Sequence, residues 1–341
     1  MDDRLTGFRY SVAIRTLGLA GEKYQQELDS IKNQSIKPEK VIVYLAEGYE
    51  PPKETIGLEE IVYVKKGMVA QRALEYREID SPFILLLDDD VFLQEDSVEK
   101  LALGLIECGG DCIAADTFRS HEMTFVSKVR AIITNWAIPF YSKKWAIIVQ
   151  HTGSFFYNNK PKKDVYLAQS AAGPCSLWDK RALLGIHFHD EIWLDQLGFS
   201  YGDDLLFFHK LFVNGGRLLF HYNSGAVHLD SRSSRGSYVR DPEKLRKRAR
   251  AWFLLWWRID FDRDGLSCPR RILSLIEFII KFIYSIMIHL LVSIVSLSYK
   301  PLSNYILGNI DALKFVNSEQ YRRVPNFRVS DSFPGDTARV S

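Results

Sequence analysis

A single stretch, Pro82–Leu93, constrains the fold more than any other part of the chain. It reads PFILLLDDDVFL, so an unbroken apolar run, Phe83–Leu87, ends directly on three carboxylates. Such a run has the length and composition of a parallel strand that is buried on both faces. Adjacent carboxylates at a strand end repel one another unless a cation lies among them, and a divalent ion held together with phosphate oxygens is a suitable one. Asp88 and Asp90 are therefore interpreted as a metal–phosphate clamp, with a solvated acidic turn as the alternative.

Other short apolar runs alternate with helical patterns on both sides of this stretch. Strands are predicted over Ser11–Ile14, Lys40–Leu45, Ile61–Val64, Cys112–Ala115, Ala168–Asp179 and Arg217–Tyr222. Helices are predicted around Tyr24–Ile31 and over Val69–Ile79, Ser97–Glu107, Lys180–Leu184 and Leu205–Phe212. Strands and helices that alternate at this spacing form parallel βαβ units, which bind ligands at the carboxyl ends of their strands. The sequence therefore predicts an α/β fold with the acidic triplet at the ligand-binding edge of the sheet.

Composition excludes some classes of partner. The apolar fraction of 47% supports a substantial core, while 44 basic and 42 acidic residues nearly cancel to a formal charge of +2. No global field therefore favours nucleic acid. The four cysteines lack the paired spacing of a zinc site and are expected to be reduced. The N-terminal sequence has no basic segment followed by a long apolar core, so no secretory signal is predicted and the catalytic part is expected in the cytosol.

A series of segments occurs in a particular order along residues 8–260. They are SVAIRT, SIKNQ with Pro38, VIVYLAEG, KGMVAQRALE, FILLLDDDV, GPCSLWDKRALLGIHFHDEIW, YGDDLLFFHKLFVNGG and a histidine after the next strand. This order resembles family two of the glycosyltransferases, in particular its membrane-associated bacterial members. The resemblance implies the GT-A fold, a Rossmann-like and mostly parallel sheet flanked by helices. It also implies a nucleotide-diphosphate sugar as donor, with a UDP-sugar favoured, and Mn²⁺ or Mg²⁺ as cofactor.

The resemblance implies a role for each residue that matches the family motifs. Asp88 and Asp90 match the DxD pair, which holds the ribose and the metal-bridged diphosphate, and His228 matches a histidine that reaches the metal or the diphosphate. Asp204 matches the general base, as the second member of the Asp203–Asp204 pair. The residues implied to bind the nucleotide are Arg15, Thr16, Glu47, Gly67, Arg72, Asp88 and Asp89. Without the resemblance, each of two residues has a structural interpretation. Asp204 could be an acid favoured at a helix N-terminus, and His228 could be a buried histidine with its hydrogen bonds satisfied.

Two positions depart from the family pattern. Relatives usually carry an Asp-Asp-Gly-Ser type of sequence where this chain has Ala46-Glu47-Gly48-Tyr49, which leaves the identity of the nucleotide base open. The first acid of the second pair is Asp203 where relatives have glutamate, and its shorter reach bears on how the acceptor is positioned.

The catalytic domain is predicted over residues 1–240. Its nucleotide-sugar half is expected at about 8–116 and its acceptor half at about 117–240. The segment Thr117–Gln169 is rich in aromatic and basic residues, including Trp136 and Tyr141. It is interpreted either as a variable wall that receives the acceptor or as an insertion with its own small core.

Residues 241–316 are predicted to form a helical, membrane-associating appendage. In Pro242–Arg258 a basic cluster directly precedes Trp252, Phe253 and two further tryptophans. This composition suits an anionic membrane interface, and it equally suits a helix that packs on the catalytic domain with its charges in water.

The apolar segment Leu273–Leu297 is long enough to span a membrane. Its polar residues recur every three or four positions and fall within an arc of about 160° at 100° per residue. An in-plane helix would leave Glu277 and Lys281 in water, whereas a spanning helix would bury them in lipid. We therefore expect a peripheral protein on the cytoplasmic face of the inner or plasma membrane, with a single spanning helix as the alternative. Residues 317–341 are predicted to be a polar, disordered tail.

These features together predict an inverting, metal-dependent glycosyltransferase. It would move a sugar to a hydroxyl of a glycan or a lipid-linked acceptor during polysaccharide synthesis. A sugar nucleotidyltransferase is an alternative, but Ser11–Gly21 lacks the glycine density of that class. A non-catalytic, membrane-attached scaffold is another, and the intact set of Asp88, Asp90 and Asp204 argues against it.

Overall fold

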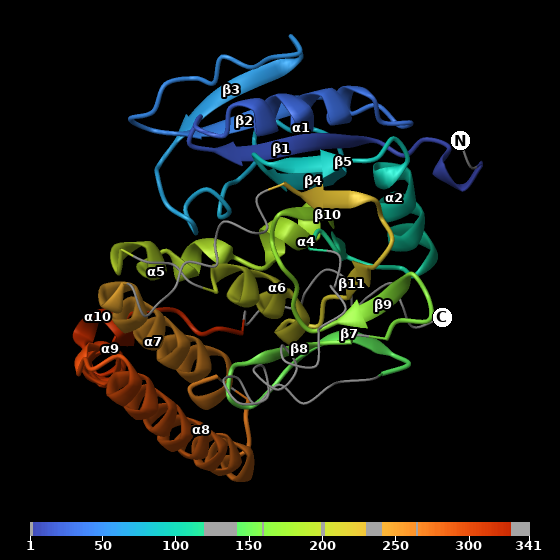
Figure 1. Cartoon of the computed structure of the whole chain (residues 1–341). Coiled ribbons are helices and arrows are strands. Elements are labelled where there is room, and N and C mark those ends of the chain that lie inside the picture. Colours follow the sequence, from blue (N-terminus) through green and yellow to red (C-terminus); the bar gives the residue numbers. More distant parts are fainter. Residues whose placement is uncertain are drawn as a thin grey trace.

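The structure, a computed structural model, describes residues 3–118, 142–158, 160–198, 202–229, 241–263 and 265–328. Within these ranges ten strands form one mixed sheet in the order β3-β2-β1-β4-β10-β6-β11-β9-β7-β8, and β5 pairs separately with β12 (Figure 1). The strands are β1 (Tyr10–Thr16), β2 (Val41–Ala46), β3 (Glu59–Val64), β4 (Phe83–Asp88), β5 (Val91–Leu93), β6 (Cys112–Ala115), β7 (Trp145–Val149), β8 (Phe155–Tyr157), β9 (Val165–Ala168), β10 (Cys175–Asp179), β11 (Leu218–His221) and β12 (Ala226–His228). The helices are α1 (Glu22–Lys32), α2 (Ser97–Glu107), α4 (Lys180–Gly185), α5 (Trp193–Gln196), α6 (Asp203–Val213), α7 (Pro242–Trp256), α8 (Cys268–Val295), α9 (Lys300–Val316) and α10 (Glu319–Arg322). Short helical turns η1 (Asp3–Leu5), η2 (Phe188–Glu191) and η3 (Trp257–Phe261, a π-helix) complete the set.

The N-terminal half of the sheet is parallel. Strands β3, β2, β1 and β4 run in one direction, and β10 joins β4 in the antiparallel sense. Successive residues of β1 enter different cores, since Val12 and Ile14 pack with α1 and α2 while Ala13 packs on the other face. Helices thus cover both faces of the sheet, and this mixed α/β architecture confirms the predicted fold class.

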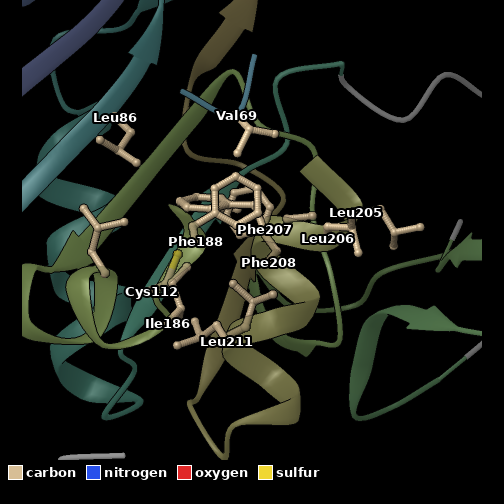
Figure 2. Packing of buried hydrophobic residues seen from close by; sticks show 14 of the residues in the cluster. Val69, Leu86, Cys112, Ile186, Phe188, Leu205, Leu206, Phe207, Phe208 and Leu211 are labelled. Atoms are coloured by element: carbon tan, nitrogen blue, oxygen red, sulfur yellow. The ribbon is translucent and has the colours of Figure 1, made fainter. Parts of the chain in front are cut away.

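Helix α6 covers the face opposite α1. Its rings Phe207 and Phe208 pack with Phe188 in the core (Figure 2). The centroid of Phe207 lies 4.8 Å from that of Trp178 on β10. Buried aromatic side chains of this size contribute much of the core energy, and their packing fixes the position of the helix. The first residues of α6, Asp203 and Asp204, are thereby held near the ends of the central strands.

Two predicted elements take a different form. Val69–Ile79 is not a helix but a series of turns. Tyr76 has a φ of 50°, which a helix interior does not tolerate, and side chains from elsewhere bind the backbone of this segment. The predicted strand Ala168–Asp179 is β10 preceded by the end of β9, with an irregular link through Gly173.

The C-terminal helices pack onto the α/β domain at the end of the molecule opposite β1–β3 (Figure 1). Arg258 of η3 forms a buried ion pair with Glu191, with 2.8 Å between Nη2 and Oε1. Lys210 of α6 contacts the same carboxylate at 3.3 Å. Phe327 is only 1% exposed and lies beneath both cations. The prediction of a disordered tail is therefore wrong for residues 317–328, which contain α10 and this buried ring.

Some sequence predictions fall outside the described ranges. Trp136 and Tyr141 of the expected acceptor wall do so, as do residues 329–341 of the predicted tail. The described part of the same region contributes β7, β8 and β9 to the sheet.

The polar stripe of α8 faces the protein, so the prediction that it would lie in water is wrong. Ser274 is buried, where its hydroxyl donates to the His151 carbonyl at 2.8 Å and accepts from the Trp256 indole at 2.8 Å. The Lys281 ammonium donates to the Ser154 hydroxyl. Burial lowers the pKa of Lys281 to about 8. The polar side chains of α8 thus find their partners in the rest of the protein, and the opposite face of the helix is apolar and exposed.

Candidate active site

The acidic triplet lies where the ends of β1, β4 and β10 meet. Arg15 and Asp88 are paired in the β1–β4 register, and their side chains form an ion pair. The Asp88 backbone N–H donates to the Pro174 carbonyl at 3.0 Å. The carboxyl edge that was predicted to bind a ligand is thus built from a cation and an anion fixed on neighbouring strands.

Asp89 turns toward the end of β1. It accepts a hydrogen bond from the Thr16 hydroxyl, which itself accepts from the Gly18 N–H at 2.7 Å. Burial is the main cause that raises the pKa of Asp89 to about 6; the charges of Asp88 and Asp90 act in the same direction, and the Thr16 hydrogen bond opposes them. The structure therefore brings together the predicted residues Arg15, Thr16, Asp88 and Asp89.

Asp90 and His228 form the next pair along this edge. Strand β5 begins directly after Asp90 and pairs with β12, which places His228 Nε2 at 3.1 Å from Asp90 Oδ1. The backbone fixes both residues, since Leu229 N–H donates to the Asp90 carbonyl at 2.9 Å and His228 N–H to the Thr117 carbonyl at 3.0 Å. The structure thus brings together a histidine and a carboxylate that are separated by more than a hundred residues.

The donor set at this position suits a metal ion that arrives with a substrate. In the described ranges, no group of three or more His, Cys, Asp or Glu side chains is arranged to hold a metal ion. Asp90 and His228 offer one carboxylate and one imidazole. Sites that bind Mg²⁺ with phosphate commonly use one or two carboxylates and take their remaining ligands from the substrate and water. The pair fits such a shared site and does not fit a site built from protein ligands alone.

A buried carboxyl group, Glu27, lies behind the triplet. Its Oε2 accepts from the Val91 N–H at 3.1 Å and its side chain is fully enclosed. Burial raises its pKa well above the usual range, and the charges of the acidic triplet act in the same direction. Sequence reasoning missed this residue. The available signal was its position three residues after Tyr24 on a helix face that is otherwise apolar.

The second acidic pair meets Arg72 across the site. The Arg72 Nε lies 3.2 Å from Asp203 Oδ2, and its Nη1 forms an ion pair with Asp204. Asp204 also accepts from the Gly173 N–H at 3.1 Å, and a Cβ at position 173 would collide with both side chains. The side chain of Asp204 is 33% exposed, against 5% for Asp203. Asp204 is therefore the acid of this pair that a substrate can reach.

Electrostatics link this cluster to the triplet. Burial raises the pKa of Asp203, and Asp204 adds to the shift while Arg72 opposes it. The pKa of Arg72 is raised because Asp204, Asp203 and Asp88 together outweigh the opposing effect of burial. Asp88 and Asp204 thus act on one guanidinium, and a change at either carboxylate alters the field at the other.

The turn segment that carries Arg72 is anchored by Asp195 on α5. The Asp195 carboxylate accepts from the Val69 N–H at 3.0 Å and from the Ala70 N–H at 2.8 Å. Gly67 lies against the same carboxylate, where any Cβ would collide with it. Gln71 donates to the Thr16 carbonyl at 3.2 Å, which ties the segment to the end of β1. The structure therefore places Gly67 and Arg72 on one anchored turn, and their predicted contact with the nucleotide stays a prediction. Asp195 was not foreseen because nothing in its local sequence marks it.

Glu47 lies apart from the charged clusters. It follows β2, two strands from β4 along the sheet, and its side chain is exposed. Its backbone N–H donates to the Val64 carbonyl at 2.8 Å. The residue is thus at the same edge as the triplet and open to a ligand that extends along it.

Comparisons with known proteins give a limited result. No protein-family model and no curated protein matches the chain. Among solved structures, that of S. aureus TarS 1–349 in complex with UDP-GlcNAc is similar over 90% of this chain and 92% of that one, with 12% sequence identity and a TM-score of 0.41. The identity and the TM-score are both too low for this likeness to bear on reaction or substrate.

Proposed function

We propose that the chain is an inverting, metal-dependent glycosyltransferase of family two with a GT-A fold. Its donor is a nucleotide-diphosphate sugar, with a UDP-sugar favoured, and its acceptor is a hydroxyl of a glycan or a lipid-linked sugar. The observation that carries the proposal is the meeting of two acidic groups at one sheet edge. The Asp88–Asp90 turn with His228 lies on one side, and Asp204 is connected to it through Arg72.

The two acidic groups have different roles in the proposed reaction. Asp90 and His228 would hold Mn²⁺ or Mg²⁺, and the bound ion would stabilise the negative charge that develops on the leaving diphosphate. Arg15 and Thr16 hold Asp88 and Asp89 in place beside the nucleotide. Asp204 accepts the proton of the acceptor hydroxyl. At the same time the hydroxyl oxygen of the acceptor forms a bond to the anomeric carbon, and the bond from that carbon to the diphosphate breaks.

The Arg72 ion pair positions Asp204. The Arg72 Nη1 pairs with the Asp204 carboxylate, and the Gly173 N–H donates to the same carboxylate at 3.1 Å. The same guanidinium lies within the electrostatic reach of Asp88. We infer that a bound donor, which is negatively charged, competes with Asp204 for Arg72.

Membrane attachment forms the second part of the proposal. Helix α8 is 28 residues long and only 6% of its most apolar segment is buried, so its length and composition alone would allow it to cross a membrane. Its inward stripe is bonded to the protein through Ser274 and Lys281. A helix held in this way supports attachment in the plane of the cytoplasmic leaflet, with the exposed apolar face in the lipid.

Nucleotide binding to the full chain tests the proposed function. A panel of UDP, GDP, ADP and CDP is added with and without Mn²⁺, and the unfolding temperature is measured. A ligand at 100 times its dissociation constant stabilises the native state by about 2.7 kcal/mol. We expect the largest increase with UDP and Mn²⁺ together. A chain that no nucleoside diphosphate stabilises, with or without the metal, would contradict the proposal.

A further inference from the structure

A cavity lies away from the acidic triplet, between the acceptor half of the sheet and the start of α8. It has a volume of about 270 Å³ and is lined by β7, the end of β9, α6 and the link between η3 and α8. Pockets that enclose a drug-sized ligand usually measure about 300–1,000 Å³. The cavity is therefore too small for a nucleotide sugar but large enough for a single charged group with a few attached atoms.

Arginines dominate the charge around this cavity. Arg263 and Arg270 line it, and the charge of Arg328 also acts on Arg263. The lining carboxylate is Asp260, with 3.7 Å between its Oδ1 and Arg270 Nη2. Burial lowers the pKa of Arg263, and repulsion from Arg270 adds to this effect while Asp260 opposes it. Three guanidinium groups against one carboxylate leave a positive field that an anion would neutralise.

The remaining ionisable groups at the cavity reduce the excess of positive charge but do not reverse it. Burial lowers the pKa of His209 to about 3, so its ring is neutral, and its Nδ1 contacts the Gln169 carbonyl at 2.9 Å. The Glu277 carboxylate lies 3.4 Å from the lining residue His151 and is a second carboxylate near the cavity. The three arginines still outnumber the two carboxylates.

The cavity adjoins the face that is proposed to enter the membrane. Arg270 lies in the first turn of α8 and its side chain is 46% exposed. The exposed apolar residues of the helix begin two positions later, at Ile272, which is a rise of about 3 Å. A group held by Arg270 would therefore lie beside the start of the exposed apolar face, which an in-plane helix places against the lipid.

We propose that Arg263 and Arg270 form a binding site for the phosphoryl headgroup of an anionic membrane lipid. The inference rests on the proposed membrane location. Guanidinium groups match the geometry of phosphate oxygens with paired N–H donors, and two of them suit a doubly charged phosphomonoester. The apolar face of α8 would hold the acyl chains while the cavity holds the headgroup. The site would thereby fix the orientation of the catalytic domain on the leaflet.

The test compares binding of the full chain to vesicles of neutral phosphatidylcholine and to vesicles that also contain phosphatidic acid. The variant Arg263→Gln with Arg270→Gln keeps the Arg263 carbonyl, which accepts from Arg271. A surface-bound arginine is worth about fivefold in affinity for anionic lipid, so the double variant is expected to bind the anionic vesicles roughly 25-fold more weakly. Binding to neutral vesicles should be unchanged.

A matched control uses Arg322→Gln with Arg323→Gln, two exposed arginines on and beside α10. An equal loss of binding in this control would mean that diffuse surface charge attracts the lipid, and the proposed site would be wrong. Arg263→Lys with Arg270→Lys guards against misfolding, because it keeps the charge and should retain most of the preference for anionic vesicles. Vesicle binding by the glutamine variant at the level of the unmodified protein would also overturn the proposal.

The source of the phosphoryl group is resolved in a separate arm. Inorganic phosphate and glycerol 3-phosphate are titrated into the protein without vesicles, and the unfolding temperature is followed. A stabilisation by these anions that the glutamine variant loses would support a phosphoryl site that also accepts soluble compounds. Stabilisation by UDP and Mn²⁺ should persist in the variant, so a failure of the lipid site is distinguishable from a failure of the proposed enzyme activity.

Discussion

Asp203 and Asp204 are adjacent in the chain, yet their side chains differ in access. Asp203 is almost fully enclosed beside the Arg72 guanidinium, while one third of the Asp204 side chain is exposed. A proton acceptor must come within hydrogen-bond distance of the hydroxyl that it activates. Exposure therefore favours Asp204 as the base and leaves Asp203 to hold Arg72 in position.

We predict that Asp204→Asn lowers turnover by roughly 10²-fold or more while donor binding stays nearly unchanged. The amide cannot accept the acceptor's proton, but it preserves the shape of the group that contacts Gly173. Steady-state transfer and UDP binding are measured on the same preparation. The comparison variant is Asp203→Asn, which should chiefly reduce stability. A large loss of turnover in Asp203→Asn without one in Asp204→Asn would exchange their roles.

Asp90→Asn is predicted to remove the Mn²⁺-dependent part of UDP binding and to abolish transfer. The substitution takes a hard anionic ligand from the proposed shared site and leaves His228 as the neighbouring donor. Thermal stabilisation by UDP is compared with and without Mn²⁺. Asp96→Asn serves as the matched control, since Asp96 lies six residues after Asp90, its side chain is 51% exposed and it pairs with Lys100. Retention of the metal effect in Asp90→Asn would remove Asp90 from the site.

The residues of the site were predictable where the chain order carries information. Arg15 and Asp88 stand near the ends of neighbouring parallel strands, which bring such ends to one edge of a sheet. His228 reaches Asp90 through the separate antiparallel pairing of β12 with β5. Glu27 and Asp195 were missed because each acts through a partner that is distant in the sequence. A lone acid in a helix does not reveal which backbone N–H groups it will meet.

Some helices and strands were predicted correctly from the sequence and others were not. Strands β1, β2 and β4 follow from their apolar runs, and α6 from its helical spacing and the Asn-Gly-Gly sequence that follows it. The segment Val69–Ile79 has a helical pattern, but the Asp195 carboxylate satisfies its first N–H groups and Tyr76 takes a left-handed conformation. The polar stripe on α8 was recognised from its period. Whether the stripe faces water or the protein depends on distant partners such as Ser154, which lies between β7 and β8.

The turn that carries Arg72 provides a prediction at the scale of the element. Asp195→Ala removes two hydrogen bonds from a charged acceptor to backbone N–H groups and is expected to cost about 1.5–3 kcal/mol of stability. Because Arg72 is three residues beyond Val69, UDP binding should weaken as well. Urea unfolding and UDP titration measure the two effects. The control is Asp80→Ala, at an exposed aspartate. If both variants lost the same stability and the same UDP affinity, Asp195 would have no positioning role.

At the scale of the whole molecule, the C-terminal helices and the catalytic domain share one core. Phe327 and Tyr321 are buried against the catalytic domain, and Arg258 is paired with Glu191. Gly308 of α9 lies against the backbone of α7, where a side chain would not fit. The sequence predicted a membrane-associating appendage, but removing the chain from Cys268 onward would expose this shared core. Substitutions on the outer face of α8 are therefore the appropriate means to examine attachment.

The outer face of α8 gives the last prediction. Ile279, Ile283 and Met287 are each about half exposed, and the helix turns its charged residues Glu277 and Lys281 toward the protein. Changing all three to Gln removes about 1.5 kcal/mol of lipid burial at each position. The triple variant is thus expected to bind vesicles on the order of 10³-fold more weakly, with its remaining attraction sensitive to salt because charges are screened and apolar burial is not.

Vesicle flotation at low and high salt measures this loss, and Leu19→Gln with Leu58→Gln is the matched control at exposed apolar residues far from α8. Equal flotation of the triple variant and the unmodified protein would exclude this face as the membrane contact. Protection of a tag after Ser341 from protease in sealed vesicles separates the two modes of attachment. A tag on the same side as the catalytic domain is expected for an in-plane helix. A tag on the opposite side would require α8 to cross the bilayer and to break the contacts of Lys281 and Ser274 with the segment 151–154, which hold the helix on the protein.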